Sequence, residues 1–377
     1  MQIVLDLVAS TETTTRADVA RTTGLTRATI STIVGELIDD GLVVEVGRGQ
    51  SEGGKPPTLI SLNKDGRHLI AVDLSASPFS GRIVNLAGQP IGETMTADPS
   101  GDHQADLNTL IARLAATTNR PVVGVSVASP GVITDDGVVV EASNLDWHNH
   151  RLASLTEAAC GLPVTVVNDA QAAAVTAYAR LVAELSEGDR PPSDLLLIQI
   201  GGAGVGAGII LGGRIHLGSH RAAGEIGHSV LDPEGRRCHC GNRGCLETVA
   251  SASAIYSRFA NKKVGAARWD LERAKAKFGC ETVEAALVEA GQAIGSTLGI
   301  LINALDISLL VISMQSERAA ESVARAVDQT LTPRVLPALR PDLQVTAVGG
   351  NDLSLLGAAA VVLNDRFGLS WLMPATS

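Results

Sequence analysis

The sequence predicts an α/β protein whose body consists of sheets covered by helices, preceded by a small α+β module. Two observations predict the body. Apolar runs typical of strands alternate with helical patterns from residue 68 to residue 364, and several of these runs end on polar residues, as in strands that line a crevice. A third observation predicts the module: residues 13–62 carry a helix–turn–helix pattern followed by a hairpin.

Length, composition and charge limit the classes of protein to which the chain can belong. The chain has 377 residues, of which 45% are hydrophobic and only 2% aromatic, enough for two or three domains with aliphatic cores. We find neither a signal-peptide pattern after Met1 nor an apolar run of about 18 residues without Gly or charge, so we expect no membrane span. A cytoplasmic location follows, where thiolates stay reduced. The net charge of −10 excludes general coating of nucleic acid but allows one small DNA-reading face.

The N-terminal pattern predicts two short helices in sequence. Residues 16–23 predict a helix that ends at Gly24, and Thr26 is placed to cap the next helix. The second helix carries one apolar stripe with helical spacing, formed by Ile30, Ile33, Val34, Leu37 and Ile38. Its opposite face has small or hydrogen-bonding side chains, which suit a close approach to base edges.

The two helices are followed by alternating residues 42–46 and 58–62, which predict two strands. The Gly-rich loop between these strands carries two cations and resembles the wing of a winged helix. We therefore expect DNA contacts from Arg16, Thr26, Arg27, Ala28, Thr29, Ser31, Thr32, Arg48 and Lys55.

The local charge of the module is mixed. Residues 1–60 hold five Lys/Arg against eight Asp/Glu, whereas residues 13–34 hold three Arg against one Asp. The proposed face therefore has the right sign but neutralises few phosphates, so we expect modest salt dependence of DNA binding. A small helical bundle that serves only dimerisation is the alternative interpretation.

Seven strands and four helices are expected in the body. The expected strands are residues 68–74, 81–85, 121–128, 164–169, 195–200, 307–313 and 343–348, and the expected helices are residues 170–180, 283–305, 315–332 and 353–364.

A cluster of cysteines predicts a metal site. Cys238, Cys240 and Cys245 fall within eight residues, and His228 lies ten residues before them. Three thiolates and one imidazole suit tetrahedral Zn²⁺, and four protein ligands leave no open position, so the ion would be structural. Ordinary buried thiols are the alternative. The two remaining cysteines are expected to be plain core thiols: Cys160 and Cys280.

The acidic residues around this cluster complete a family signature. Residues 224–228 (GEIGH) followed by residues 238–247 (CHCGNRGCLE) resemble the signature of the ROK family, which comprises repressors, open reading frames and sugar kinases. The resemblance covers about residues 68–365. It implies zinc on His228, Cys238, Cys240 and Cys245, and sugar contacts from Glu225, His228 and Glu247.

The resemblance also implies the actin-like ATPase architecture, in which two related lobes hold a ligand in the cleft between them. Asn168-Asp169 resembles the family's Asn-Asp pair, whose Asp takes the proton from the sugar hydroxyl in kinases, although Gln171 stands where Asn is usual. Asn144 begins a segment similar to one that places an Asn on the sugar. The expected sugar contacts are therefore Asn144, Asn168, Asp169, Glu225, His228 and Glu247.

The half of the body that would hold ATP departs from the family pattern. Kinases of this type have Asp-x-Gly-Gly-Thr in the first phosphate loop, whereas this chain has Asp73-Leu74-Ser75-Ala76. Without those glycines the backbone donors cannot approach phosphate closely. Residues 311–315 also lack a Gly-Gly that the family often shows, although residues 201–204 keep a Gly-rich loop. Kinase activity, with Asp169 as catalytic base, is therefore the alternative rather than the expectation.

The combined expectation is a sugar-responsive transcriptional regulator, a repressor, because the preserved sugar half, the altered ATP half and the N-terminal module together resemble the repressor branch of the family. Residues 1–64 would form the winged helix-turn-helix domain, residues 65–172 a first lobe completed by a C-terminal helix within 353–377, and residues 173–352 a second lobe with the zinc loop. A homodimer or homotetramer would bind a pseudo-palindromic operator. A zinc-stabilised sugar-binding protein whose front module only dimerises is a third interpretation.

Overall fold

The computed structural model describes residues 1–50, 56–186, 190–260, 270–350 and 352–369. Its N-terminal module has the element order of a winged helix, with a three-stranded sheet in the order β1-β3-β2. The elements are α1 (Gln2–Ala9), β1 (Thr14–Thr15), α2 (Arg16–Thr23), α3 (Arg27–Asp39), β2 (Val43–Arg48) and β3 (Thr58–Leu62). The helices and strands expected in this part of the sequence are confirmed, while residues 51–55 of the wing lie outside the described residues.

Local signals set the ends of the two central helices as expected. Gly24 ends α2 in the left-handed conformation, with φ of +70°. Thr26 caps α3, because its side-chain oxygen accepts a hydrogen bond of 3.2 Å from the backbone N–H of Thr29. The apolar stripe of α3 faces the core, where Ile30, Val34 and Leu37 are fully buried.

The body contains two five-stranded sheets with the same topology. In each sheet one strand pairs antiparallel with the next strand of a meander and parallel with a later strand on its other side. The first sheet has the order β11-β7-β4-β5-β6 and the second the order β14-β13-β12-β15-β16. This repetition confirms the expectation of two related lobes.

The strands of the two sheets include all seven that were expected. The first sheet contains β4 (His68–Asp73), β5 (Ser80–Asn85), β6 (Pro90–Thr96), β7 (Val122–Ser129) and β11 (Val164–Asn168), and the second contains β12 (Leu195–Ile200), β13 (Val205–Leu211), β14 (Arg214–Ile215), β15 (Leu309–Met314) and β16 (Gln344–Gly349). A small third sheet, in the order β10-β9-β8, consists of β8 (Val132–Ile133), β9 (Val139–Ala142) and β10 (Trp147–His150).

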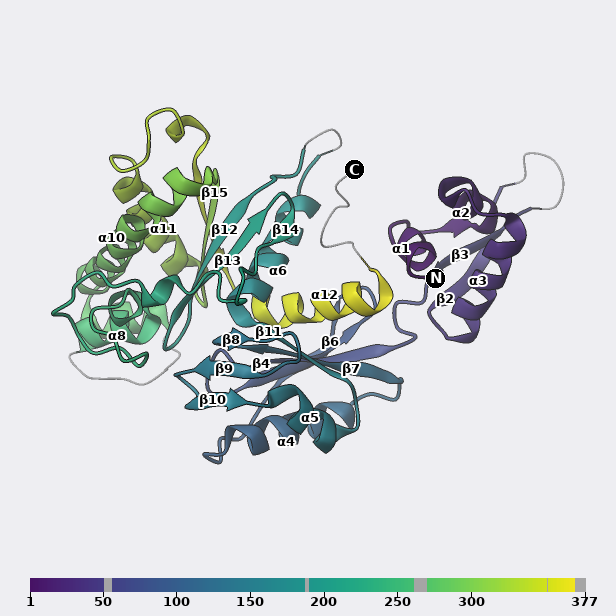
Figure 1. Cartoon of the computed structure of the whole chain (residues 1–377), viewed down its shortest axis with the longest axis horizontal. Helices are drawn as coiled ribbons and strands as arrows, with labels where there is room; N and C mark the ends of the chain where they lie inside the picture. Colours follow the sequence, from purple (N-terminus) through teal and green to yellow (C-terminus); the bar gives the residue numbers. More distant parts are fainter. Residues whose placement is uncertain (51–55, 187–189, 261–269, 351, 370–377) are drawn as a thin grey trace.

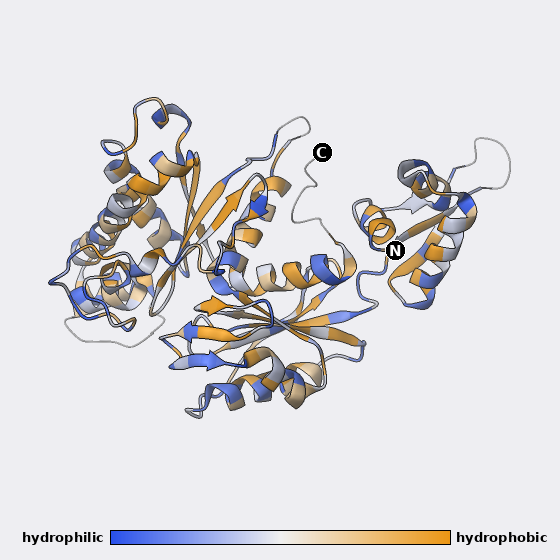
Figure 2. Ribbon diagram, viewed as in Figure 1, coloured by the Kyte–Doolittle hydropathy of each residue, from blue (hydrophilic) through white to orange (hydrophobic). Residues whose placement is uncertain are grey.

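Helices cover both faces of each large sheet, and hydrophobic residues are concentrated in the strands and central helices (Figure 2). Their buried side chains form the cores between the layers. The outer face of the first sheet carries α4 (His103–Ala115) and α5 (Leu152–Cys160). The outer face of the second carries α8 (Ala252–Ala260), α10 (Cys280–Leu305) and α11 (Glu317–Leu331), with the short helices α7 (Glu247–Ala250) and α9 (Leu271–Phe278) packed on α10. Two short 3₁₀ helices complete the list: η1 (Ile226–His228) and η2 (Arg340–Asp342).

Two helices lie between the lobes at the centre of the molecule (Figure 1). α6 (Asp169–Ala183) packs on the second sheet, and α12 (Leu353–Phe367) packs on the first. The two helices touch at Gly357, where an added Cβ would lie 1.8 Å from the carbonyl oxygen of Ala172. The expected lobe boundary at residue 172 therefore falls inside a helix that contacts both lobes, and the exact domain limits stay a prediction.

The N-terminal module packs directly against the body. Gln2 Nε2 donates hydrogen bonds to the carbonyl oxygens of Asp365 and Arg366, at the end of α12. Arg67 donates two hydrogen bonds to the carbonyl oxygen of Asp40, and Asn63 donates one to that of Gly41. A single apolar cluster runs from α1 through the module into β4 and α12.

One helix of the second lobe is long and apolar enough to cross a membrane by length and composition alone. This helix is α10, and half of its most apolar window is buried inside the protein. Its buried side chains pack in the core of the second lobe, against α11 and the second sheet. The burial is that of a core helix, in line with the expectation of no membrane span.

Candidate functional site

The six predicted sugar contacts come together in one pocket. This pocket is open to solvent and lies between the lobes. It is lined by residues 130–132 and 141–144 of the first lobe, by residues from 199–206 and 225–247 of the second, and by Ser75 and residues 168–170. All of Asn144, Asn168, Asp169, Glu225, His228 and Glu247 line it. We call it the cleft pocket.

The start of α6 places Asn168 and Asp169 in the cleft pocket. Asn168 Oδ1 caps the helix by accepting a 2.9 Å hydrogen bond from the N–H of Gln171, and its Nδ2 donates to the carbonyl oxygen of Gly131. Both ends of this amide are thus engaged, so Asn168 mainly fixes the geometry of the helix start. Asp169 accepts a hydrogen bond from the N–H of Ala170 through one oxygen and has its other oxygen available for a ligand.

The carboxyl group of Asp169 is electrostatically strained. Burial, together with the nearby carboxylates of Asp73 and Glu225, raises its pKa to about 7. A carboxyl group with this pKa holds a proton part of the time at neutral pH. It can therefore donate or accept a hydrogen bond with a hydroxyl group of a ligand.

A tight loop places Glu225 and His228 opposite this helix start. Gly224 allows the loop to cross β13, because its φ is +99° and an added Cβ would lie 1.9 Å from the carbonyl oxygen of Ala207. Glu225 Oε2 lies 3.8 Å from His228 Nε2, and burial raises the pKa of Glu225. The other ring nitrogen of His228, Nδ1, lies 3.6 Å from Cys238 Sγ.

The two nitrogens of His228 therefore face different groups. Nδ1 is directed at the cysteines, and Nε2 is directed at Glu225 in the cleft pocket. When one imidazole nitrogen binds a metal, the other carries the proton and donates a hydrogen bond. This geometry explains how one histidine can serve both a metal and a polar ligand.

The four predicted metal ligands form a compact group. The ligand atoms of His228, Cys238, Cys240 and Cys245 all lie within 4.8 Å of one another. Tetrahedral zinc with Zn–S bonds of about 2.3 Å holds two sulfurs about 3.8 Å apart, and a sulfur and a nitrogen about 3.6 Å apart. The Sγ atoms of Cys240 and Cys245 are separated by 3.7 Å, and Cys238 Sγ lies 3.6 Å from the imidazole. The residues present thus fit a tetrahedral ion of this size.

The cluster also contacts a carboxylate of the cleft pocket. Cys238 Sγ donates a hydrogen bond of 2.8 Å to Glu247 Oε1. Burial raises the pKa of the Cys238 thiol, and this hydrogen bond to Glu247 raises it further. The two other cysteines lie elsewhere: Cys160 is half-buried, and Cys280 is exposed at the start of α10. The expectation that Cys280 is a core thiol is therefore wrong, because the first turn of α10 projects beyond the packed face of the helix.

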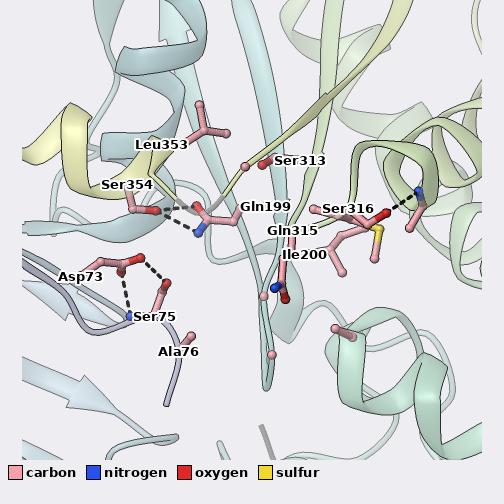
Figure 3. Close-up of a pocket in the computed structure, with 16 residues that line it drawn as sticks. Asp73, Ser75, Ala76, Gln199, Ile200, Ser313, Gln315, Ser316, Leu353 and Ser354 are labelled. Carbon is pink, nitrogen blue, oxygen red and sulfur yellow. Dashed lines mark hydrogen bonds between the residues drawn. The ribbon is translucent and has the colours of Figure 1, made fainter. Parts of the chain in front are cut away.

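A second pocket lies next to the first and shares Ser75, Gln199 and Gly201 with it. It contains the three segments in which the sequence resembles or departs from a phosphate site: residues 73–76, residues 201–202 and residues 313–315. Figure 3 shows that Asp73 accepts hydrogen bonds from Ser75, while Gln199 pairs with Ser354 at the start of α12.

Among the described residues, this second pocket offers few groups that could bind a triphosphate. Asp73 accepts a 2.8 Å hydrogen bond from the N–H of Ser75 and a 2.9 Å hydrogen bond from its hydroxyl, so the carboxylate is engaged by its own loop. The same backbone N–H is thereby withdrawn from any phosphate oxygen. Among the described residues that line the pocket, none is a lysine or an arginine. Phosphate binding needs such donors or cations.

The predicted DNA contacts of α3 lie on an exposed face of that helix. Arg27, Ala28, Thr29, Ser31 and Thr32 are exposed along α3. Exposed Thr26 shares a hydrogen bond of 2.9 Å with the hydroxyl of Thr29.

Two arginines at the edge of this face differ in how far other groups restrain their side chains. Arg16 is half-buried and forms an ion pair of 2.9 Å with Glu45, which holds its side chain against β2. Arg48 is exposed at the end of β2. Lys55 lies outside the described residues.

The cleft pocket has further polar residues that the sequence did not single out. Glu141 and Ser143 come from the small third sheet and the turn after it, and His239 and Asn242 come from the cysteine loop. The last two stand between predicted metal ligands, so their proximity to the cleft pocket could have been expected from the signature. Glu141 carries no such signal, since only the fold of β9 brings it to the cleft.

Comparison with known proteins places this chain in a family. The sequence pattern of the ROK family matches residues 69–365. The chain belongs to the ROK family, and its body has the two-lobed architecture of an actin-like ATPase that was expected.

Curated relatives of this chain include regulators. The xylose repressor of Caldicellulosiruptor bescii is 28% identical over 385 residues, which cover 96% of this chain and 95% of that protein. The DNA-binding transcriptional dual regulator NagC of Escherichia coli K12 is 28% identical over 363 residues, or 92% of this chain and 88% of NagC. A further relative, from Caldicellulosiruptor sp., is 34% identical over 263 residues, and the match spans only 64% of that relative.

Solved structures agree with this assignment. A crystal structure of a ROK family transcriptional regulator, a homologue of the E. coli MLC protein, matches with a TM-score of 0.77 and 26% identity over 98% of this chain and 96% of the other. A ROK family glucokinase from Streptomyces griseus, solved with glucose and AMPPNP, matches with a TM-score of 0.65. The match covers 78% of this chain and 98% of the glucokinase chain. At 24% identity the glucokinase supports the fold of the body alone.

Proposed function

We propose that this protein is a sugar-responsive transcriptional repressor that binds operator DNA through its N-terminal module and a monosaccharide in the cleft pocket. The observation that carries the proposal is that one chain holds both a polyol-type pocket and a winged helix, joined through α12. The similarity to regulators over almost the whole chain supports it.

The cleft pocket suits a polyhydroxylated ligand. Each hydroxyl group that leaves water must regain its hydrogen bonds, which requires fixed acceptors and donors. Asp169, Glu225 and Glu247 offer acceptors, whereas His228 Nε2 and Asn144 offer donors. These groups come from both lobes, so a bound sugar would hold the lobes in one arrangement.

The metal would be zinc with a structural role. His228, Cys238, Cys240 and Cys245 would hold it, and the four ligands leave no position for a reacting water. The ion supplies a rigid crosslink for the loop. It would thereby fix the orientation of His228 Nε2 in the cleft pocket.

The path from sugar to DNA would run through the two central helices. α6 begins in the cleft pocket and packs along α12 at Gly357, and the end of α12 is bonded to Gln2 of α1. A sugar that binds one arrangement of the lobes better shifts the population toward it, by no more than the difference in affinity. Movement of α12 would then reposition the winged helix.

In a symmetric dimer or tetramer this movement would change the spacing of two winged helices. Half-sites of a pseudo-palindromic operator lie about one turn of DNA apart, so altered spacing weakens binding. Arg27 and its exposed neighbours on α3 would face the major groove, with Arg48 and Lys55 near the backbone. The protein would act in the cytoplasm, where both the DNA and reduced thiols are found.

Two assays test the proposal. In a mobility-shift assay, the protein should retard DNA from upstream of its own gene, and one sugar of a monosaccharide panel should change this binding. Absence of any retarded DNA would overturn the proposed repressor function.

A coupled assay for ADP release should detect no turnover, because the pocket beside the cleft lacks a phosphate cradle. Turnover above about 1 s⁻¹ would instead establish an ATP-dependent sugar kinase with Asp169 as base. Sugar affinity without DNA affinity would leave a sugar-binding protein whose module only dimerises.

A further inference from the structure

The charged side chains that line the cleft pocket are all acidic, apart from two histidines. Among the described lining residues, four are carboxylates and none is a lysine or an arginine. The carboxylates are Glu141, Asp169, Glu225 and Glu247. Carboxylates that share one pocket repel one another.

Positive groups near the pocket are directed elsewhere. Arg236 lines a separate pocket and bonds the carbonyl oxygen of Thr248. Arg243, between two cysteines of the loop, donates to the carbonyl oxygen of Gly235. The positive end of α6 points into the cleft, but the side chains of Asn168 and Asp169 already occupy its first N–H groups.

Zinc would not reverse this sign. A zinc ion with three thiolates and one neutral imidazole carries a net charge of −1, because three thiolates outweigh the divalent ion. Cys240, one of the expected ligands, lines the cleft pocket directly. The loaded site therefore adds to the negative potential that a ligand meets there.

Glu141 stands at the mouth of the pocket, on the side opposite the ROK signature. It lies on β9, paired with Val132 of β8 and His148 of β10. Its side chain is directed by Ser143, whose hydroxyl donates a hydrogen bond of 3.0 Å to Glu141 Oε1. It lines the cleft pocket from the first lobe, whereas Glu225 and Glu247 line it from the second.

We infer that the cleft pocket admits only uncharged sugars, and that Glu141 is a specificity residue that excludes phosphorylated and acidic sugars. The inference rests on the proposed sugar-sensing function and narrows it to one chemical class of effector. A phosphate or carboxylate on the sugar would meet four carboxylates and, among the described lining residues, no lysine or arginine to pair with. Like charges brought close together oppose binding, most strongly at low salt, where they are least screened.

Calorimetric titration of the full-length protein with matched ligand pairs tests the inference. Glucose is paired with glucose 6-phosphate and with glucuronate, and N-acetylglucosamine is paired with its 6-phosphate; xylose is a further uncharged probe. The titrations are carried out at low salt and about pH 8, where an ordinary imidazole is neutral. For any sugar that binds, the anionic partner should bind at least about 100-fold more weakly. A 6-phosphate that binds within tenfold of the free sugar, or more tightly, would overturn the inference and leave the sugar sensor standing. Absence of binding by every probe would contradict the proposed sugar-sensing function, and with it the inference that depends on that function.

Two substitutions of Glu141 and one control variant isolate the role of Glu141. Glu141→Lys should reduce the discrimination between sugar and sugar phosphate by at least about tenfold, because repulsion at the mouth becomes attraction. Glu93→Lys, on exposed β6 of the same lobe, makes the same change in net charge outside the cleft pocket and should leave the ratio unaltered. Glu141→Gln, which keeps the size and the acceptor oxygen, should give an intermediate ratio. An unchanged ratio in Glu141→Lys would refute the role of this residue.

Discussion

Gln199 Nε2 donates a hydrogen bond of 3.0 Å to the hydroxyl of Ser354, and thereby joins the floor of both pockets to the first turn of α12. Gln199 is the last polar residue of β12 before the Gly-rich loop, and Ser354 lies 155 residues further along the chain. The bond ties the start of α12 to the residues that line both pockets, whereas the end of α12 touches α1 of the N-terminal module. Four predictions follow from this arrangement and from the groups around it.

The contact between α6 and α12 should be intolerant of even one methyl group. In Gly357→Ala the new Cβ would meet the carbonyl oxygen of Ala172, so we expect a loss of about 1–3 kcal/mol in the free energy of unfolding. Sugar should also change DNA affinity less than in the parent. Gly35→Ala is a matched control, because an added Cβ there meets nothing within 4 Å in the middle of α3. Helix propensity should make this control more stable by about 0.5–1 kcal/mol. Denaturant unfolding that gave equal stability for Gly357→Ala and the parent would contradict the packing.

Removal of one thiol should release the metal. In Cys240→Ser we expect zinc affinity to fall by at least about 100-fold, since even changes around metal ligands cost 10–100-fold. Glu225 and Glu247 would lose their support, so sugar would no longer alter DNA binding. Elemental analysis after dialysis against a chelator measures the loss. Cys280→Ser, at an exposed cysteine away from the cluster, should retain the metal of the parent. Equal zinc in Cys240→Ser and the parent would mean that Cys240 is not a ligand.

Asp169→Asn should reveal the cost of a buried carboxyl group. Because burial raises the pKa of Asp169 from 3.8 to about 7, the folded protein holds this proton more tightly than the unfolded chain does. Its contribution to stability is therefore fully present below about pH 4 and is lost as the pH rises toward 7. The amide does not titrate. The stability of Asp169→Asn relative to the parent should increase between pH 5 and pH 8, by at most about 2–3 kcal/mol.

Thermal unfolding of both proteins across that range checks this sign. A stability difference that stays constant between pH 5 and pH 8 would mean that Asp169 titrates normally in the folded protein. Sugar affinity should fall in Asp169→Asn at every pH, because the second carboxyl oxygen is lost as an acceptor.

Arg27 should contribute to operator binding and to nothing else. In Arg27→Ala we expect a loss of about 1–3 kcal/mol in the free energy of DNA binding if the side chain reads a base, or a salt slope reduced by about 1 if it contacts phosphate. Arg113→Ala, on α4 of the first lobe, removes an equal charge far from the module and should leave DNA affinity unchanged. Sugar affinity should stay at the parent value in both variants. A parallel loss of sugar and DNA binding in Arg27→Ala would mark Arg27 as structural.

Strong local signals made much of the fold predictable. Gly24 and Thr26 determine where α2 ends and α3 begins, and the alternation of strand and helix patterns gives the two lobes. The metal cluster was predictable because its ligands are close in sequence. The short strands β8 to β10 were not, since they are two to four residues long and are held by pairing with one another.

Glu141 was missed for the same reason, because its place at the cleft depends on that pairing. The engagement of Asn168 as a helix cap was also beyond the sequence. An Asn at the end of a strand can cap a helix or face a ligand, and only the position of Gly131 shows that both ends of its amide are occupied. The ion pair of Arg16 with Glu45 likewise depends on how β2 lies beside α2.

The apolar cluster that joins the module to the body has a consequence for how such regulators diversify. Val4, Leu5 and Val8 of α1 share one interior with Leu363 and Leu369 at the far end of the chain. A gene fusion that transplanted the first 62 residues onto an unrelated carrier would bare these aliphatic side chains to water, and insolubility would follow. Transfer of the N-terminal module from one protein of this design to another therefore requires transfer of α12 as well.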